Sequence, residues 1–152
     1  LVGSEMCIRD RYKLVNHGYK ETMGRIGKFP FPMSVEEALS YIKNKLEIPV
    51  LRYAGNRDRL VEKIAILGGA GAEFAEVAKS MGADLYLTGD LKYHEAQDAA
   101  MNGLVIADGG HFYTERVIIP YLAKRLRDEF KTRGWNVGVL EDVRAKDIFH
   151  CV

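Results

Sequence analysis

The sequence predicts an α/β fold with a mainly parallel sheet and helices on both of its faces. Between residues 61 and 140, short apolar strand candidates alternate with segments of helical periodicity. This alternation is typical of βαβ units, whose right-handed crossovers place successive strands parallel to one another. The strand candidates are apolar at successive positions, as expected of a sheet that is covered on both sides.

The first predicted helix has a clear start signal. Ser34 and Glu37 have the spacing of a capping box, in which each side chain bonds the backbone N–H of the other residue. We therefore predict a helix from this point to about residue 46. The preceding residues 12–33 contain several glycines and prolines, so we expect them to be irregular.

The remaining elements follow from apolar runs and helical spacing. Pro120 lies inside the last predicted helix and is expected to kink it. The predicted strands are residues 49–54, 61–67, 84–87, 104–107 and 136–140, and the predicted helices are residues 72–81, 91–101 and 114–131.

Length and composition limit the class of protein. The chain has 152 residues, about the size of one domain, with 47% hydrophobic and 28% charged residues. Its net charge of +1 gives no electrostatic reason to expect a nucleic-acid or membrane-surface partner. The cysteines, Cys7 and Cys151, form neither a disulfide framework nor a zinc pattern, so we expect a cytoplasmic protein.

The opening run LVGSEMCIRDR, residues 1–11, has neither strand nor helical periodicity. Residues 5–10 match the in-frame translation of a sequencing-adapter end. We therefore interpret residues 1–11 as a non-native, adapter-derived tract that belongs to no sheet, and we assign the domain to residues 12–152. The alternative is a natural N-terminal arm.

Polar residues follow three of the predicted strands at their carboxyl ends. A glycine turn at residues 68–71 follows the first, Asp90 with His94 one turn later follows the second, and His111 with Glu115 follows the third. Open α/β sheets bind ligands at this edge, and parallel strands bring their carboxyl ends together. We therefore expect these residues to lie near one another.

His111 and Glu115 form the sharpest motif. An i, i+4 pair at the start of a helix points both side chains the same way, and an imidazole and a carboxylate are good ligands for zinc, iron or manganese. The alternative is a solvated His–Glu pair. Asp90 suits a helix cap, a partner of a metal ligand or a general base, and His94 suits a general acid/base or a structural histidine.

The glycine turn permits a further hypothesis. Residues 69–74, GAGAEF, begin like a dinucleotide-binding fingerprint, with Asp90 about 20 residues further on. Phe74, however, occupies the place of the third glycine. A tight strand-to-helix turn that needs small residues is the alternative, so a dinucleotide-binding module is the weaker functional hypothesis.

Four motifs in order resemble the Nif-three-like dinuclear metal-centre family, also called GTP cyclohydrolase I type 2 homologues. The resemblance covers roughly residues 20–152 and is most specific in its third and fourth motifs. The motifs are MGRIG at 23–27, LGGAG at 67–71, LTGDLKYHE at 87–95 and DGGHFYTE at 108–115.

The resemblance implies a two-lobed α/β fold around two divalent metal ions (zinc, iron or manganese), assembled into a hexamer. It implies that His111 and Glu115 are metal ligands and that His94 and Asp90 are the catalytic candidates. The paired histidines of the family's first lobe have no counterpart in this sequence. We therefore expect this chain to be the second lobe of a truncated protein, and to bind metal weakly and lack activity alone.

The function implied by the resemblance is that of a metal-dependent hydrolase acting on a small phosphorylated or nucleotide-like substrate. The alternative is a non-catalytic metal-binding or scaffold protein that forms a ring-shaped homo-oligomer. Neither function involves nucleic acid or a membrane as a partner.

Overall fold

A computed structural model describes residues 7–10 and 23–150 of the chain. It contains one six-stranded sheet in the order β1-β2-β4-β5-β6-β3. The strands are β1 (Cys7–Asp10), β2 (Arg25–Ser34), β3 (Arg52–Ala54), β4 (Leu60–Ala70), β5 (Leu85–Gly89) and β6 (Val105–Asp108), and the helices are α1 (Val35–Leu46), η1 (Ala72–Phe74), α2 (Ala75–Ser80), α3 (Tyr93–Met101), α4 (His111–Glu115) and α5 (Ile118–Thr132).

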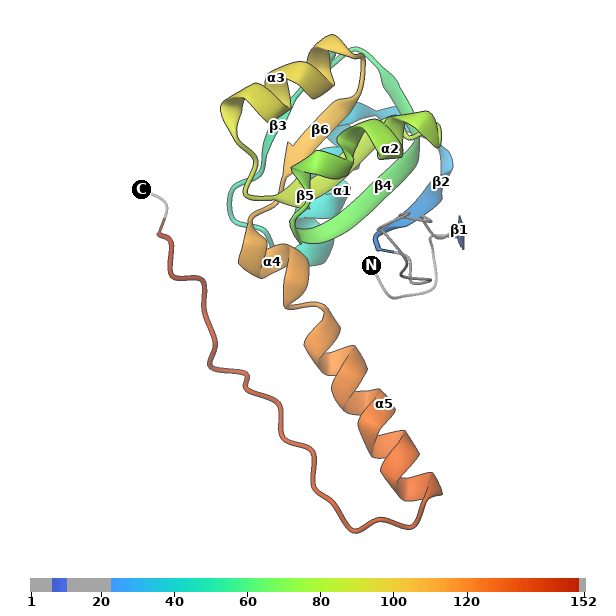
Figure 1. Cartoon of the computed structure of the whole chain (residues 1–152), viewed down its shortest axis with the longest axis vertical. Helices are drawn as coiled ribbons and strands as arrows, with labels where there is room; N and C mark the ends of the chain where they lie inside the picture. Colours follow the sequence, from blue (N-terminus) through green and yellow to red (C-terminus); the bar gives the residue numbers. More distant parts are fainter. Residues whose placement is uncertain (1–6, 11–22, 151–152) are drawn as a thin grey trace.

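The centre of the sheet is parallel and its flanks are antiparallel. β4 pairs with β5, and β5 with β6, in parallel. The flanking strands β2 and β3 run antiparallel to β4 and β6. In Figure 1, α2 and α3 cover the front of the sheet and α1 lies behind it. The predicted α/β class, with helices on both faces, is therefore confirmed, and the parallel pairing is confined to the central strands.

Each face of the sheet has its own core, because successive residues of β5 point to opposite sides. Leu85 and Leu87 pack on the side of Ile42 in α1. Tyr86, between them, packs with Ala78 of α2 on the other side. Every residue of β5 is buried, which explains why its first three residues are all apolar instead of alternating with polar ones.

The predicted capping box begins α1. Ser34 Oγ accepts the backbone N–H of Glu37 at 3.3 Å, and the Ser34 N–H donates to the Glu37 carboxylate at 2.8 Å. The helix then buries Ala38, Ile42 and other residues of its inner face. This part of the prediction is confirmed.

The irregular segment predicted for residues 12–33 is wrong over its second half, where β2 forms a ten-residue strand. The pairing of β2 with β4 shifts register between Lys28 and Met33, and Pro30 and Pro32 lie within that interval. Proline has no N–H for a ladder and is tolerated in sheets at such irregularities. The prolines that suggested a loop therefore lie in a break of the ladder.

The expectation that residues 1–11 belong to no sheet is wrong for residues 7–10. These residues form β1, which pairs antiparallel with β2 through Cys7↔Lys28 and Asp10↔Ile26. An uncovered strand edge offers N–H and C=O groups to any extended segment, which is the physical reason for the pairing. Residues 1–6 and 11–22 lie outside the described residues, and the adapter-derived origin stays a prediction.

Two expectations for the C-terminal third are wrong. Residues 136–140 form no strand, and the Val139 carbonyl accepts a hydrogen bond from the Arg127 side chain at 3.0 Å. The predicted helix over residues 114–131 is divided between α4 and α5, so the break precedes Pro120. Pro120 lies in the first turn of α5, where its missing N–H has no intrahelical partner to lose.

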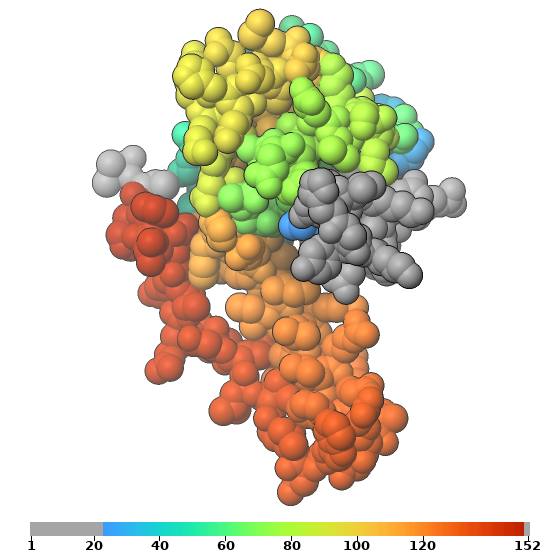
Figure 2. All heavy atoms as spheres, in the orientation of Figure 1, coloured from blue at the N-terminus to red at the C-terminus, as the bar shows by residue number. Residues whose placement is uncertain are grey.

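Helix α5 projects away from the sheet, and the segment after it runs back alongside (Figures 1 and 2). Only Ala123 of this 15-residue helix is buried, whereas Ile118, Ile119 and Leu122 are exposed. No helix in the part of the chain that the structure describes is long and apolar enough to cross a membrane.

Asp84 joins the start of β5 to β4 and to the loop before β4. Its carboxylate accepts the backbone N–H groups of Glu62 and Lys63 at 3.0 and 2.9 Å and pairs with Arg59 at 2.8 Å. Burial alone would raise the pKa of Asp84, but these hydrogen bonds outweigh it and hold the pKa below its ordinary value. The ionised carboxylate therefore stabilises the folded state.

We predict that Asp84→Ala lowers the free energy of unfolding by about 1–3 kcal/mol, because two strand N–H groups and a guanidinium lose their acceptor. The folded-state pKa lies below the unfolded one. The stabilisation is therefore complete above pH of about 4 and is lost as the pH falls through the folded-state pKa. Urea unfolding of both proteins at neutral and acidic pH measures this. Asp98→Ala, at an exposed position of α3, is the control. A difference as large in acid as at neutral pH would contradict the prediction.

Candidate functional site

The ends of the parallel strands meet beside α4, which contacts both β4 and β5. At Gly89, the last residue of β5, an added Cβ would lie 2.9 Å from the carbonyl carbon of Gly110 and from the nitrogen of His111. Only a glycine allows the start of α4 to approach this closely. The approach places the first residue of α4, His111, directly beside the turn that follows β5.

His111 lies between two carboxylates. Its Nδ1 is 2.7 Å from Asp90 Oδ2, and its Nε2 is 3.2 Å from Glu115 Oε2. Glu115 reaches the ring because it lies one turn further along α4, whereas Asp90 comes from the turn after β5. All three side chains are roughly half exposed. They form an open polar cluster, named here the His111 cluster, at the carboxyl edge of the sheet.

The two carboxylates act on opposite sides of the imidazole. The hydrogen bond with Asp90 is the largest cause that raises the pKa of His111 above its ordinary value. Desolvation opposes the rise, and the charges of Glu115 and Asp90 and the contact with Glu115 add to it. In the neutral ring, Asp90 can accept only a proton on Nδ1, which leaves Nε2 as a lone-pair donor facing Glu115. A metal-binding histidine is commonly oriented by such a carboxylate.

The backbone of Asp90 has a positive φ of 55°. Among residues other than glycine, Asp and Asn tolerate this left-handed region best. Helix α3 begins at Tyr93 with Lys92 as its N-cap residue, so the alternative in which Asp90 caps this helix is wrong. The turn directs the Asp90 side chain to His111 instead.

Two buried threonines hold the glycine turn against α4. Thr88 Oγ1 donates to the Gly69 carbonyl at 2.9 Å, and the Gly69 N–H donates to Thr114 Oγ1 at 3.0 Å. Both backbone polar groups of Gly69 are therefore bonded within the protein. A Cβ on Gly69 would collide with the Glu115 carboxylate, so the turn makes room for that side chain. This packing role disfavours the dinucleotide hypothesis.

Among the described residues, no hydrogen bond or ion pair joins His94 to the His111 cluster. His94 lies on the exposed side of α3, and its ring packs edge-on against Tyr93 with 5.5 Å between centroids. It is not among the described residues that line the cavity beside His111. The structure thus brings together Asp90, His111 and Glu115. The role of His94 as a general acid/base stays a prediction.

A cavity of about 1090 Å³ adjoins the His111 cluster. Besides the cluster, its wall includes Arg52 of β3, Asp108 of β6 and His150 of the C-terminal segment. Sequence reasoning assigned none of them an individual role, although Asp108 begins the motif DGGHFYTE. Arg52 reaches the cavity only because β3 pairs antiparallel with β6, and no motif in the sequence reports that pairing.

The donor set of the His111 cluster fits part of a metal site. Among the described residues, no group of three or more His, Cys, Asp or Glu side chains is arranged to hold a metal ion. Asp90 contacts the ring nitrogen opposite to Glu115, so it would orient the histidine and not share its ion. The cluster therefore offers two ligands of suitable chemistry, fewer than the three protein ligands typical of a catalytic zinc site.

A model of the family Duf34/NIF3 (NGG1p interacting factor 3) matches residues 3–146. The chain belongs to the Duf34/NIF3 family. The resemblance drawn from the four sequence motifs is thereby confirmed.

Several proteins named GTP cyclohydrolase 1 type 2 homolog are similar to the chain in sequence. A Bacillus subtilis (strain 168) protein named GTP cyclohydrolase 1 type 2 homolog is 34% identical over 130 residues, which cover 86% of this chain and 35% of that protein. A Listeria innocua protein of the same name is 36% identical over 122 residues, covering 80% of this chain and 32% of that protein. The chain spans about a third of the length of these relatives.

Solved structures of NIF3-related proteins share the fold. The crystal structure of a Bacillus cereus protein related to NIF3 superposes with a TM-score of 0.83 at 35% identity, over 91% of this chain and 38% of that chain. The crystal structure of the Staphylococcus aureus protein SA1388 superposes with a TM-score of 0.80 at 32% identity, over 85% of this chain and 42% of that chain.

We predict that Asp90→Asn lowers the pKa of His111 toward its ordinary value, because the hydrogen bond with Asp90 is the largest cause of the rise. Asparagine tolerates positive φ, so the turn should keep its shape. Titration of the ring by ¹H–¹⁵N NMR measures the change. Glu115→Gln is the comparison and should lower the pKa by less. An unchanged pKa in Asp90→Asn would mean that the contact does not exist in solution.

We predict that Gly68→Ala destabilises the protein more than Gly138→Ala. Neither glycine has a positive φ, so alanine brings no left-handed strain to either position. At Gly68 the new Cβ would lie 2.8 Å from the backbone carbonyl oxygen of Thr114, which can move aside only with α4, whereas nothing lies within 4 Å at Gly138. The free energies of unfolding in urea should differ by about 1 kcal/mol or more. Equal losses would show that α4 does not pack this closely against the turn.

Proposed function

We propose that this chain contributes to a two-metal, metal-dependent hydrolase that acts on a small phosphorylated or nucleotide-like substrate in the cytoplasm. The observation that supports this most is the His111–Glu115 pair, with 3.2 Å between Nε2 and Oε2, whose histidine is bonded to Asp90 through its other nitrogen. The relatives' name, GTP cyclohydrolase 1 type 2 homolog, is consistent with a nucleotide-like substrate.

His111 and Glu115 are the proposed metal ligands. A neutral imidazole nitrogen and a carboxylate oxygen suit zinc, iron or manganese. Because a catalytic site needs more ligands than these, the remaining ones are proposed to come from the parts of the relatives that this chain does not cover. The half-exposed cluster leaves His111 and Glu115 accessible for such completion.

The proposed roles of the other residues follow from their positions. When bound, two divalent ions would supply water activation and polarisation of a carbonyl, imine or phosphoryl group. Asp90 keeps the proton of neutral His111 on Nδ1, so that Nε2 stays available. His94, at the exposed start of α3, is proposed as a general acid/base toward the substrate.

A second candidate function is a non-catalytic metal-binding or scaffold protein within a ring-shaped homo-oligomer, such as a hexamer. The exposed apolar side chains of α5 and of the segment after it favour an assembly role. Ile118, Leu122, Trp135 and Leu140 are all exposed. The two functions differ in whether metal loading is accompanied by turnover.

We predict that the chain binds Zn²⁺ weakly and that His111→Ala abolishes this binding, because one of only two local ligands is removed. His94→Ala is the matched control. It also removes an exposed histidine near this edge of the sheet, but its zinc affinity should equal that of the unmodified chain. Isothermal titration calorimetry measures all three proteins. Equal losses in both variants would contradict the assignment of His111.

Turnover is tested on a complete relative, such as the Bacillus subtilis protein, assayed for hydrolysis of GTP and phosphate esters with and without added metal. Metal-dependent turnover supports the hydrolase. A metal-loaded relative with no turnover on any of these substrates would favour the scaffold function.

A further inference from the structure

We propose that Arg52 and Lys92 bind the phosphoryl group of the ligand, in a hollow that adjoins the cavity of the His111 cluster. The inference deepens the proposed function, and rests on it in taking this phosphoryl group as part of the substrate. It names the side chains, outside the His111–Glu115 pair, that would bind the phosphoryl group of such a substrate.

The hollow has a volume of about 410 Å³ and lies between β3 and the start of α3. Arg52 and Tyr53 line it from the strand, and Lys92 and Tyr93 line it from the turn and helix. Arg52 and Asp108 also line the larger cavity, so the two spaces meet at this ion pair. A single small ligand can therefore reach both.

Arg52 is fixed in place from one side. It is paired directly opposite Asp108 in the β3–β6 ladder, and its Nη2 donates to Asp108 Oδ2 at 2.5 Å and to the Leu91 carbonyl at 3.4 Å. The hydrogen bonds found for this guanidinium among residues 23–150 all come from Nη2. Its Nε and Nη1 groups have no partner among these residues, and each can donate a charge-assisted hydrogen bond to an oxygen of a phosphoryl group.

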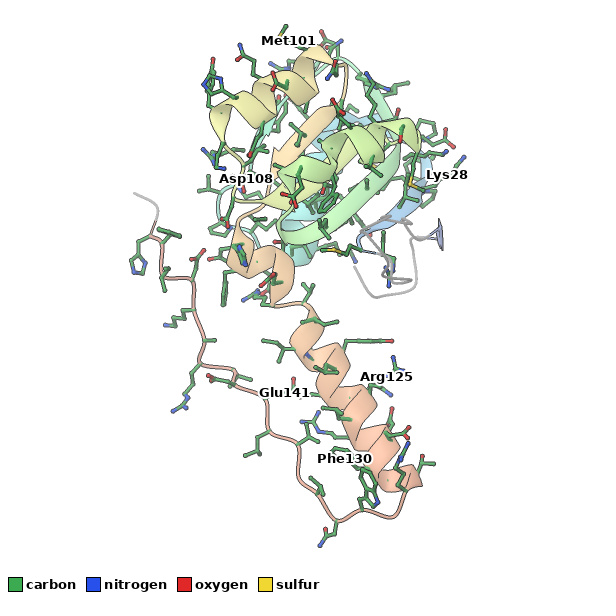
Figure 3. The ribbon with its side chains drawn as sticks, viewed as in Figure 1. Lys28, Met101, Asp108, Arg125, Phe130 and Glu141 are labelled. Carbon is green, nitrogen blue, oxygen red and sulfur yellow. The ribbon has the colours of Figure 1, made fainter. Side chains whose placement is uncertain are left out.

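The ion pair with Asp108 does not use the whole of the Arg52 guanidinium. Asp108 is buried, and it already accepts the backbone N–H groups of Leu91 and Gly110 at 3.3 and 3.0 Å (Figure 3 labels it at the end of β6). The Arg52 side chain, in contrast, is 70% exposed. This exposure leaves the rest of the guanidinium accessible to a ligand that carries negative charge.

Lys92 adds a second exposed cation to the same hollow. Its side chain is 82% exposed, and its ammonium lies 3.5 Å from Glu95, a long separation for an ion pair. Asp108 is the only carboxylate among the hollow's described lining residues and is buried, while Glu95 lies beside Lys92 outside that lining. Each cation therefore has a carboxylate neighbour, and the attraction for a phosphoryl group, whose charge is about −1.5 to −2 at neutral pH, comes from the two exposed cationic groups and their unused N–H donors.

The hollow is joined to the His111 cluster through one turn. Asp90 contacts His111, and the next two residues, Leu91 and Lys92, line the hollow. A ligand whose phosphoryl group lies between Arg52 and Lys92 would therefore extend past this turn toward Nε2 of His111. Binding energy from the remote phosphoryl group would then position the reacting group at the proposed metal site.

The test is the affinity of the chain for inorganic phosphate, measured by ¹⁵N NMR titration without metal. We expect phosphate to shift the backbone resonances of Leu91 and Lys92 and the side-chain Nε resonance of Arg52. Lys92→Gln and Arg52→Lys should each weaken binding roughly fivefold or more, because each loses charge-assisted hydrogen bonds. Arg52→Lys keeps a cation beside Asp108, and an unchanged fold is checked in the same spectra.

Two controls separate this inference from its alternatives. Lys79→Gln removes an exposed lysine at the end of α2 and should leave phosphate binding unchanged. His111→Ala should also leave it unchanged, so that failure of the proposed metal site does not imitate failure of the phosphate site. Equal weakening by Lys79→Gln and Lys92→Gln would show non-specific attraction and overturn the proposal, as would the absence of shifts at residues 91 and 92.

Discussion

The candidate site depends on how closely the first turn of α4 approaches the ends of β4 and β5. A Cβ on Gly68 would lie 2.8 Å from the Thr114 carbonyl oxygen, and one on Gly89 would lie 2.9 Å from the start of α4. Ordinary side chains at these positions would push the helix away from the sheet. His111 would move with it, away from Asp90, which belongs to a different segment of the chain.

The turn after β5 contributes to both the cavity beside the His111 cluster and the hollow between β3 and α3. The side chain of Asp90 bonds the imidazole of His111, while the Leu91 N–H donates to Asp108 and the Leu91 carbonyl accepts a hydrogen bond from Arg52. A shift of this turn would therefore disturb the proposed metal ligand and the proposed phosphate site together. The positive φ of Asp90 gives the turn the shape that permits both contacts.

Features that depend on local sequence could be predicted, and features that depend on distant pairing could not. The capping box at Ser34 and the His111–Glu115 pair are local, because each joins residues three or four positions apart. The place of Arg52 depends on a ladder with β6, which lies more than 50 residues further along the chain. The spacing of residues near Arg52 does not predict which strand it pairs with.

The dependence on distant strand pairing also explains two other differences between the predicted and the observed elements. The prolines of β2 predicted a loop instead of a strand. They are tolerated in the strand because its ladder with β4 shifts register at these residues. Residues 136–140 have the apolar character of a strand, but a strand also needs a neighbour, and among the described residues they have no ladder partner. The position of His94 depends on how α3 lies on the sheet, which its sequence alone does not determine.

The tautomer of neutral His111 tests most directly the claim that Asp90 orients this ring for metal binding. The ¹⁵N chemical shifts of the two ring nitrogens, measured above the pKa of His111, distinguish the two neutral forms. We predict that the proton resides on Nδ1, bonded to Asp90, and that Nε2 carries a free lone pair beside Glu115. A ring protonated mainly on Nε2 would contradict this arrangement, because its metal-binding nitrogen would be blocked.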